Sequence, residues 1–268
     1  MEKSLLTEIV KRPALRYHGG KWLLAPWILQ NLPDHRIYVE PFGGAASVLL
    51  RKERSYAEVY NDKCGDVVNL FKVLRDRGDI LKEKLYNTPY SRDEFLSAYE
   101  VVECPLEQAR RMVIRSYMGF GSGGSGAHYK TGFRSNSNRS GSTPAHDWAN
   151  FPGALDALIS RLRGVVIENK DANALIKQHD SADTLFYVDP PYVLSTRNSG
   201  KVYPFELSDQ DHIDLAVLLH SVEGRVVISG YRCALYDILY YGWRRVDKVS
   251  KTNSNKRKME SLWISPSR

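Results

Sequence analysis

Short runs of apolar residues recur along this chain, separated by glycine, proline and charged positions. Such runs, bounded by turn residues, predict buried strands. We expect strands at residues 37–39, 57–60, 164–167, 184–188 and 225–229, and a closing hairpin from residues 243–249 and 260–264. Between them, the chain favours helices at residues 21–31, 45–52, 65–75, 172–178 and 209–220. Alternating strands and helices are typical of a doubly wound α/β fold with a mostly parallel sheet.

The middle of the chain follows another pattern. Residues 79–117 predict helices that break at Thr88-Pro89 and Cys104-Pro105, and Ser91 to Glu94 match a helix-capping box. Residues 118–147 are rich in Gly, Ser and Asn. A loop this long in a compact domain is either functional or disordered. A solvated linker remains the alternative for residues 135–143.

Composition and charge narrow the class of protein. The chain has 268 residues, 43% of them hydrophobic, which is enough to bury a core, and a formal net charge of +7. That charge fits a polyanion as partner. The three cysteines are far apart in the sequence, so we expect free thiols in a reducing compartment and no structural zinc. We expect no signal peptide and no membrane span.

The stretch Asp189-Pro190-Pro191-Tyr192 directly follows the predicted strand at 184–188. Two consecutive prolines stiffen the turn and donate no N–H group, so nearby carbonyls are left to accept hydrogen bonds. Asp189 and the Pro190 carbonyl can accept the two hydrogens of an exocyclic amine, and Tyr192 can stack on a flat base. These hydrogen bonds favour a localised lone pair on a nitrogen that is otherwise a poor nucleophile. An ordinary turn after a strand is the alternative.

A glycine-rich turn marks a second site. Glu40-Pro41-Phe42-Gly43-Gly44 lies between a predicted strand and a predicted helix, and Asp62 ends the next strand. A strand, a glycine-rich turn and a helix, with a carboxylate about 20 residues further on, form the nucleotide-binding unit of doubly wound folds. The turn is not GxGxxG, which argues against a dinucleotide. Gly19-Gly20-Lys21, ahead of another helix, is a weaker signal of the same kind.

The order of these motifs resembles a known family. Tyr17-x-Gly19-Gly20-Lys21, the turn at residues 40–44, Asn61-Asp62 and the stretch at residues 189–192 follow one another as in the Dam-like (D12 class, α group) DNA adenine N6-methyltransferases. The resemblance implies a seven-stranded, mostly parallel sheet with an inserted helical target-recognition domain. It also implies three parts: a cofactor half at 12–76, target recognition at 77–163, and a catalytic half with a C-terminal hairpin at 164–268.

The resemblance also implies site residues. The catalytic set would be Asp189, Pro190, Pro191 and Tyr192. The cofactor, S-adenosylmethionine, would be bound by Tyr17, Gly20, Lys21, Glu40, Pro41, Phe42, Gly43, Gly44, Asp62 and Asp171. Asp171 would hold the adenine amine of the cofactor. The family often has Phe at the next position, where this chain has Ala172. No metal site is expected.

Double-stranded DNA is the implied partner, with the target adenine flipped out of the duplex. The candidate DNA-binding residues are Arg16, Arg115, Tyr117, Tyr129, Lys130, Arg134, Arg139, Arg197, Lys256, Arg257 and Lys258. Tyr117 matches a family tyrosine that wedges into the base stack. Family members that read GATC carry an arginine where this chain has Ser122 and Gly123, so the recognition sequence stays open, with Arg134 as a candidate reader of guanine.

Several alternatives remain at this point. The methyl acceptor can instead be cytosine N4 or adenine in RNA, and a non-catalytic DNA-binding protein on the same fold is a third possibility. Ser in place of Asp189 is more frequent in the cytosine N4 enzymes. A restriction partner, a phage protection enzyme and a regulator are all compatible with the residues. We expect a cytoplasmic protein of a bacterial or phage-infected cell, acting as a monomer or as a dimer on DNA.

Overall fold

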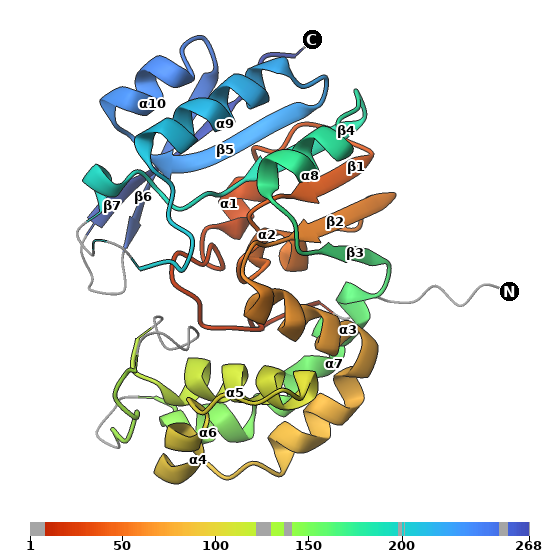
Figure 1. Cartoon of the computed structure of the whole chain (residues 1–268), viewed down its shortest axis with the longest axis vertical. Coiled ribbons are helices and arrows are strands. Elements are labelled where there is room, and N and C mark those ends of the chain that lie inside the picture. The colour runs from red at the N-terminus through yellow and green to blue at the C-terminus, as the bar shows by residue number, and fades with distance from the viewer. Residues whose placement is uncertain are drawn as a thin grey trace, which may run out of the picture. The chain divides into compact units, whose positions relative to one another are not determined.

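The computed structural model describes residues 9–121, 130–136, 141–197, 200, 202–251 and 257–267. The chain divides into two compact units, which are coloured along the sequence in Figure 1. Unit 1 comprises residues 1–20 and 65–164, and unit 2 comprises residues 21–64 and 165–268. Most of unit 1 is therefore inserted between two strands of unit 2. The first boundary falls at residue 65, where we expected 77, and residues 12–20 belong with the insertion.

Unit 2 is built on a seven-stranded sheet in the order β3-β2-β1-β4-β5-β7-β6. All strand pairs are parallel except those of β7, which is antiparallel to both β5 and β6. The strands are β1 (Ile37–Glu40), β2 (Ala57–Asn61), β3 (Val165–Glu168), β4 (Thr184–Val188), β5 (Arg225–Tyr231), β6 (Arg244–Lys251) and β7 (Arg257–Ile264). The predicted doubly wound, mostly parallel fold is thus confirmed.

The two faces of this sheet differ in polarity. Residues of one parity, among them Val39, Phe186 and Ile228, form a buried apolar core with three helices, α8 (Ala172–Gln178), α9 (Asp209–Ser221) and α10 (Ala234–Leu239). The strand register places residues of the other parity on the opposite face, including Glu40, Tyr187 and Ser229. Polar side chains near the carboxyl ends of the parallel strands therefore share one face.

The helices of unit 2 are α1 (Ala25–Leu29), α2 (Ser47–Arg51), α8 (Ala172–Gln178), α9 (Asp209–Ser221) and α10 (Ala234–Leu239). Helix α8 has the predicted bounds, and α9 begins with a reciprocal capping box between Ser208 and Asp211. Helix α1 is shorter than predicted because residues 22–24 form turns. Helix α10 has only six residues and was not predicted.

Unit 1 consists mainly of helices α3 (Gly65–Tyr86), α4 (Arg92–Ser97), α5 (Pro105–Met118), α6 (Pro144–Ala149) and α7 (Leu155–Leu162). The predicted breaks before α4 and α5 are present, and Ser91 caps α4. Helix α3 continues past the predicted end at residue 75, with a kink at Arg77. A Cβ on Gly78 would lie 2.4 Å from Ile159 of α7, so the absence of a side chain allows close helix packing. We did not predict α7.

The long loop of unit 1 is closed at its base. The Phe120 N–H donates to the Gly132 carbonyl at 2.8 Å and the Arg134 N–H to the Met118 carbonyl at 2.8 Å. These bonds flank an antiparallel bridge between Gly119 and Phe133. Among the described residues, no helix is long and apolar enough to cross a membrane.

Candidate active site

The stretch predicted as the centre of the chemistry follows the end of β4. Because β1, β2, β3 and β4 are parallel, the loops after Glu40, Asn61, Glu168 and Val188 leave the sheet at one edge. Ligands of open α/β sheets bind at this edge. The predicted catalytic and cofactor residues of unit 2 are therefore brought to one end of the sheet.

Asp189 is held through one of its two carboxylate oxygens. Its Oδ1 lies 2.9 Å from the Lys21 Nζ and accepts a hydrogen bond from the Ser229 Oγ at 2.6 Å. Within the described parts of the chain, no residue donates to the Asp189 Oδ2 or to the Pro190 carbonyl. Asp189 is 18% exposed, so it is accessible to a ligand. The motif thus presents two adjacent hydrogen-bond acceptors, the Asp189 Oδ2 and the Pro190 carbonyl. The Asp189 carboxylate is held in place through its other oxygen.

The parallel register explains why Ser229 reaches Asp189. Val188 of β4 pairs with Ile228 of β5, so the residues that follow them, Asp189 and Ser229, lie next to each other. The buried Tyr187 hydroxyl donates to the Ser229 Oγ at 3.4 Å, which leaves the serine proton for Asp189. Burial raises the pKa of Tyr187 well above its usual range, so this hydroxyl remains a donor.

Tyr192 is buried, with 8% of its surface exposed. Its hydroxyl donates to the Glu260 Oε2 of β7 at 2.9 Å, and its ring meets the Tyr231 ring edge-on at 4.7 Å. The Lys21 Nζ lies 4.7 Å from the centre of the Tyr192 ring. One face of this ring is therefore covered by a cation, which restricts the room for a base to stack on it.

Burial also affects the groups behind Tyr192. It raises the pKa of the Glu260 carboxyl, while Lys21 and the Tyr192 hydroxyl act in the opposite direction. Burial likewise raises the pKa of Tyr192 well above its usual range. Tyr192 is thus a neutral hydrogen-bond donor to Glu260 at physiological pH.

The glycine-rich turn packs closely against β2. A Cβ on Gly43 would lie 2.2 Å from the Tyr60 ring and 2.9 Å from the Asn61 carbonyl, so only glycine fits there. Asp62 accepts the Gly44 N–H at 2.8 Å and the Cys64 N–H at 2.7 Å, one on each carboxylate oxygen. Burial raises the pKa of Asp62, and these two hydrogen bonds oppose the rise. Each oxygen retains a lone pair for a further donor.

Two asparagines tie the loops after β1, β2 and β3 together. The buried Asn61 donates to the Pro41 carbonyl at 2.8 Å and accepts the Lys170 N–H at 2.8 Å. Asn169 donates to the Asp62 carbonyl at 2.7 Å. These bonds hold the candidate cofactor loops in fixed positions relative to one another.

The remaining cofactor candidates of unit 2 lie on the same loops. Glu40 is buried, and its Oε1 accepts the Tyr38 hydroxyl at 2.7 Å and the Leu49 N–H of α2 at 2.8 Å. Phe42 packs against the apolar core. The Asp171 Oδ1 caps α8, whereas its Oδ2 lies 3.8 Å from the Lys63 Nζ. Asp171 is 59% exposed and is accessible to a ligand.

Tyr17 and Gly20 belong to unit 1, where the Gly20 N–H closes a turn on the Tyr17 carbonyl at 3.2 Å. Lys21 is the first residue of unit 2. The resemblance implied that Lys21 contacts the cofactor, and the structure places its ammonium on Asp189. Arg16, also in unit 1, is half-buried, and its backbone N–H donates to the Ser116 Oγ at 2.7 Å.

Three of the expected DNA contacts are buried in unit 1. The Arg115 guanidinium donates to the Ala98 carbonyl, and burial lowers its pKa. The Tyr117 hydroxyl donates to the Pro13 carbonyl at 2.6 Å, and Arg134 donates to the Tyr117 carbonyl at 3.0 Å. In this structure, these side chains make their hydrogen bonds within the helical unit. The predicted roles of Tyr117 as a wedge and of Arg134 as a reader of guanine stay predictions.

The Arg197 side chain is 5% exposed, and Glu206 accepts from both of its terminal nitrogens. Burial raises the pKa of Glu206, but the hydrogen bonds from Arg197 and from two backbone N–H groups lower it by more. Arg197 thus organises the loop after the Pro-Pro turn, and its contact with DNA stays a prediction. Lys130 and Arg257 are exposed, and Lys258 is half-buried. Tyr129, Arg139 and Lys256 lie outside the described residues.

Sequence reasoning missed the parts that Ser229 and Glu260 play. Each is a polar residue in an otherwise apolar strand, and this is the signal that marks them. Their partners became visible only with the pairing of β4, β5 and β7.

Comparisons with known proteins identify the family that this chain resembles. The model of the D12 class N6 adenine-specific DNA methyltransferase family matches residues 17–259. A protein of Serratia marcescens named DNA adenine methylase is 29% identical over 111 residues, which are 40% of this chain. The aligned part spans 41% of that relative, less than half of its length.

Proposed function

The chain belongs to the D12 class of N6 adenine-specific DNA methyltransferases, and from this membership and its site we propose that it transfers a methyl group from S-adenosylmethionine to the N6 amine of adenine in double-stranded DNA. The observation that carries the proposal is the pair of acceptors formed by the Asp189 Oδ2 and the Pro190 carbonyl. An exocyclic amine has two hydrogens, and two adjacent acceptors match them.

Asp189 and Pro190 make the amine reactive. The lone pair of an adenine amine is delocalised into the ring. Hydrogen bonds from both amine hydrogens, one to an anion and one to a carbonyl, favour a pyramidal nitrogen with its lone pair localised. Lys21 and Ser229 hold the other oxygen of Asp189, so the carboxylate keeps its orientation while the base arrives. Positioning and polarisation, with no covalent enzyme intermediate, supply the rate enhancement.

The residues of unit 2 fit S-adenosylmethionine. Only glycine fits at position 43, and because glycine has no side chain, a ligand can approach the backbone of this turn closely. Asp62 is positioned to accept ribose hydroxyls, and the exposed Asp171 Oδ2 to accept an adenine amine. Glu40 adds a third carboxylate, and three carboxylates suit a cationic ligand better than a pyrophosphate. When bound, the cofactor supplies an electrophilic methyl group on a positively charged sulfur.

The flipped base needs acceptors that are held in fixed positions. Glu260 fixes the Tyr192 hydroxyl, and Tyr231 supports the ring from the side. These contacts keep the Pro-Pro turn and its acceptors in place. The exposed cations Lys130 and Arg257 are suitable phosphate contacts.

The test is product analysis. Purified protein is incubated with unmethylated duplex DNA and S-adenosylmethionine, and the DNA is digested to nucleosides for mass spectrometry. The expected product is N6-methyladenine with the wild-type protein and none with Asp189→Ala. Asp183→Ala is the matched control, because Asp183 is exposed just before β4 and its carboxylate has no hydrogen bond or ion pair with another described residue. It is expected to give the wild-type amount of product.

Other products would redirect the proposal. N4-methylcytosine would move the methyl acceptor to cytosine. No methylated base, together with intact DNA binding, would overturn the proposed activity in favour of an RNA substrate or a non-catalytic DNA-binding protein.

A further inference from the structure

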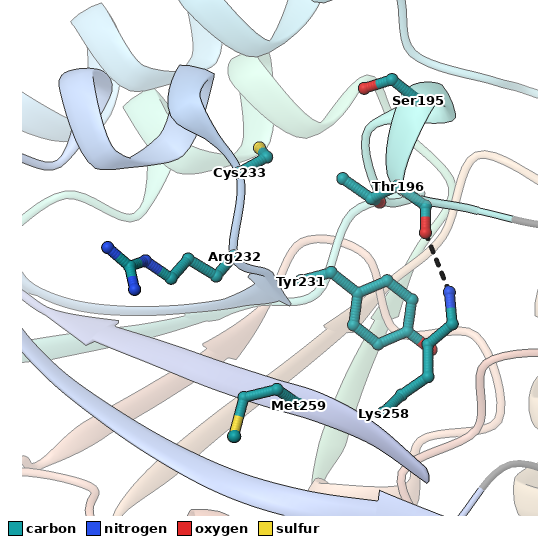
Figure 2. A pocket seen from close by; sticks show the side chains of 7 residues that line it. All are labelled: Ser195, Thr196, Tyr231, Arg232, Cys233, Lys258 and Met259. Carbon is teal, nitrogen blue, oxygen red and sulfur yellow. Dashed lines mark hydrogen bonds between the residues drawn. The ribbon is translucent and has the colours of Figure 1, made fainter. Parts of the chain in front are cut away.

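A pocket of about 390 Å³ lies beside the Asp189 site in unit 2. Its walls come from the short helix η3 (Leu194–Thr196), from the end of β5 with the two residues after it, and from β7. Figure 2 shows the Lys258 side chain reaching the Thr196 carbonyl on one side of Tyr231, and the Arg232 side chain extending on the other side. The volume is within the range of small-molecule sites, which starts at roughly 300 Å³.

The pocket is rich in hydrogen-bond donors. The Lys258 ammonium has three N–H groups, and the Thr196 carbonyl at 2.9 Å is its one hydrogen-bond acceptor within the described chain. The hydroxyls of Tyr231 and Ser195 have no acceptor among the described residues. The Arg232 Nε donates to Asp237 at 3.0 Å, so this side chain is engaged outside the pocket.

The pocket has few acceptors to match. No carboxylate lines it, and the Thr196 carbonyl is already engaged. Cys233 and Met259 complete the lining with two weakly polar sulfur atoms. Arg232 is ion-paired with Asp237, so Lys258 is the cation that lacks a carboxylate partner within the described chain, and together with two hydroxyls it favours an anion as the ligand. The Lys258 ammonium also lies 4.4 Å from the centre of the Tyr231 ring, which orients it toward the pocket wall.

One aromatic layer separates the pocket from the catalytic motif. Tyr231, which lines the pocket, meets Tyr192 edge-on at 4.7 Å. Asp189 and Tyr192 are three residues apart on the same turn. A nucleotide whose base is flipped toward Asp189 carries its own phosphodiesters, and these must lie close to the base.

We propose that this pocket receives a phosphodiester next to the target adenine, with Lys258 as its charged contact and with Tyr231 and Ser195 as hydroxyl donors. The proposal rests on the proposed function and deepens it, because it says where the flipped strand is held. Phosphate contacts fix register and orientation without reading sequence. The pocket therefore fixes the orientation in which the base enters the site, and other residues recognise the DNA sequence.

The test is a coupling experiment. The probe is a duplex that carries the methylation site recovered by sequencing the product DNA. The phosphates around the target adenine are replaced, one at a time, by neutral methylphosphonates. Wild-type protein is expected to lose about tenfold in affinity at one flanking position. Lys258→Ala is expected to bind the native duplex about tenfold more weakly than the wild type does. A methylphosphonate at that flanking position should lower its affinity no further, whereas methylphosphonates at other contacted positions should still lower it.

Control variants separate this contact from a general effect. Lys258→Arg keeps the charge and should keep the sensitivity, and Lys177→Ala, at an exposed position of α8, should behave as the wild type. Only Lys258→Ala should make the dependence of log affinity on log salt shallower, by about 0.9. S-adenosylmethionine binding by calorimetry should be unchanged in all three variants, which confirms that they fold.

Two results would overturn the proposal in distinguishable ways. If Lys258→Ala loses further affinity at every flanking phosphate, as the wild type does, the pocket does not hold one of these phosphates and the methyltransferase activity stands. If the wild type forms no methylated base, the proposed function fails and this proposal fails with it.

Discussion

Ser229 provides the sharpest test of how the site is preorganised. Its hydroxyl donates to the Asp189 Oδ1 at 2.6 Å, and the Tyr187 hydroxyl donates to it in turn. A hydrogen bond to a charged group contributes about 1.5–3 kcal/mol. Ser229→Ala removes this bond and lets the carboxylate rotate away from the amine. Lys21 still holds the same oxygen at 2.9 Å, so the loss is partial.

Converted to a rate, this loss is about 10- to 150-fold in single-turnover methylation. The assay uses saturating DNA and S-adenosylmethionine, so that binding does not limit the rate. Tyr187→Phe should cost much less, because a 3.4 Å hydrogen bond is weak. Ser221→Ala, which removes an exposed helical serine, is the matched control and should have no effect. A folded Ser229→Ala protein with a rate within about twofold of the wild type would refute the reasoning.

Three further predictions concern stability. Gly43→Ala should lower the free energy of unfolding by about 2 kcal/mol or more in urea, because the new Cβ would lie 2.2 Å from the Tyr60 ring; an unchanged midpoint would contradict this close fit. Burial raises the pKa of Glu260, so the unfolded chain loses the Glu260 proton at a lower pH than the folded protein does. The contribution of protonated Glu260 to the free energy of unfolding is therefore lost as pH rises from about 4.5. Glu260→Gln should remove that loss, and parallel pH profiles of the two proteins would argue against it. Burial lowers the pKa of His212, which contacts the Tyr236 hydroxyl, so stability should fall as pH drops below about 6.5, and His212→Asn should flatten this limb; a wild-type slope in the variant would sink the idea.

Much of the sheet was predictable because its strands are short apolar runs ended by turn residues. Strand β4 and helix α8 have the predicted bounds, and the motif at residues 189–192 leaves the sheet where expected. Helices α7 and α10 were missed, and α3 is longer than predicted. Short helices that are stabilised by packing leave only a weak periodic signal in the sequence.

The side-chain contacts were less predictable, because they depend on which strands pair. Ser229 reaches Asp189 only because β4 and β5 are parallel neighbours in one particular register. The burial of Arg115 and Arg134 likewise depends on tertiary contacts, here within unit 1. Arg115 was expected on DNA from the resemblance and Arg134 as a cation in a Gly-rich stretch, and in the structure backbone carbonyls of unit 1 accept a hydrogen bond from each guanidinium group. Sequence alone could not show that these two side chains are buried, because their backbone partners depend on how unit 1 folds.

The most direct test of the central claim is the single-turnover rate of Asp189→Asn beside the wild type. The claim is that the Asp189 carboxylate and the Pro190 carbonyl together polarise an adenine amine. Asparagine keeps the size of the side chain but removes the anion, so we expect a rate at least about 100-fold lower, with DNA and S-adenosylmethionine affinities within a few-fold of the wild type. A rate within about twofold of the wild type would contradict the claim, because the anion would then contribute nothing to the methyl transfer.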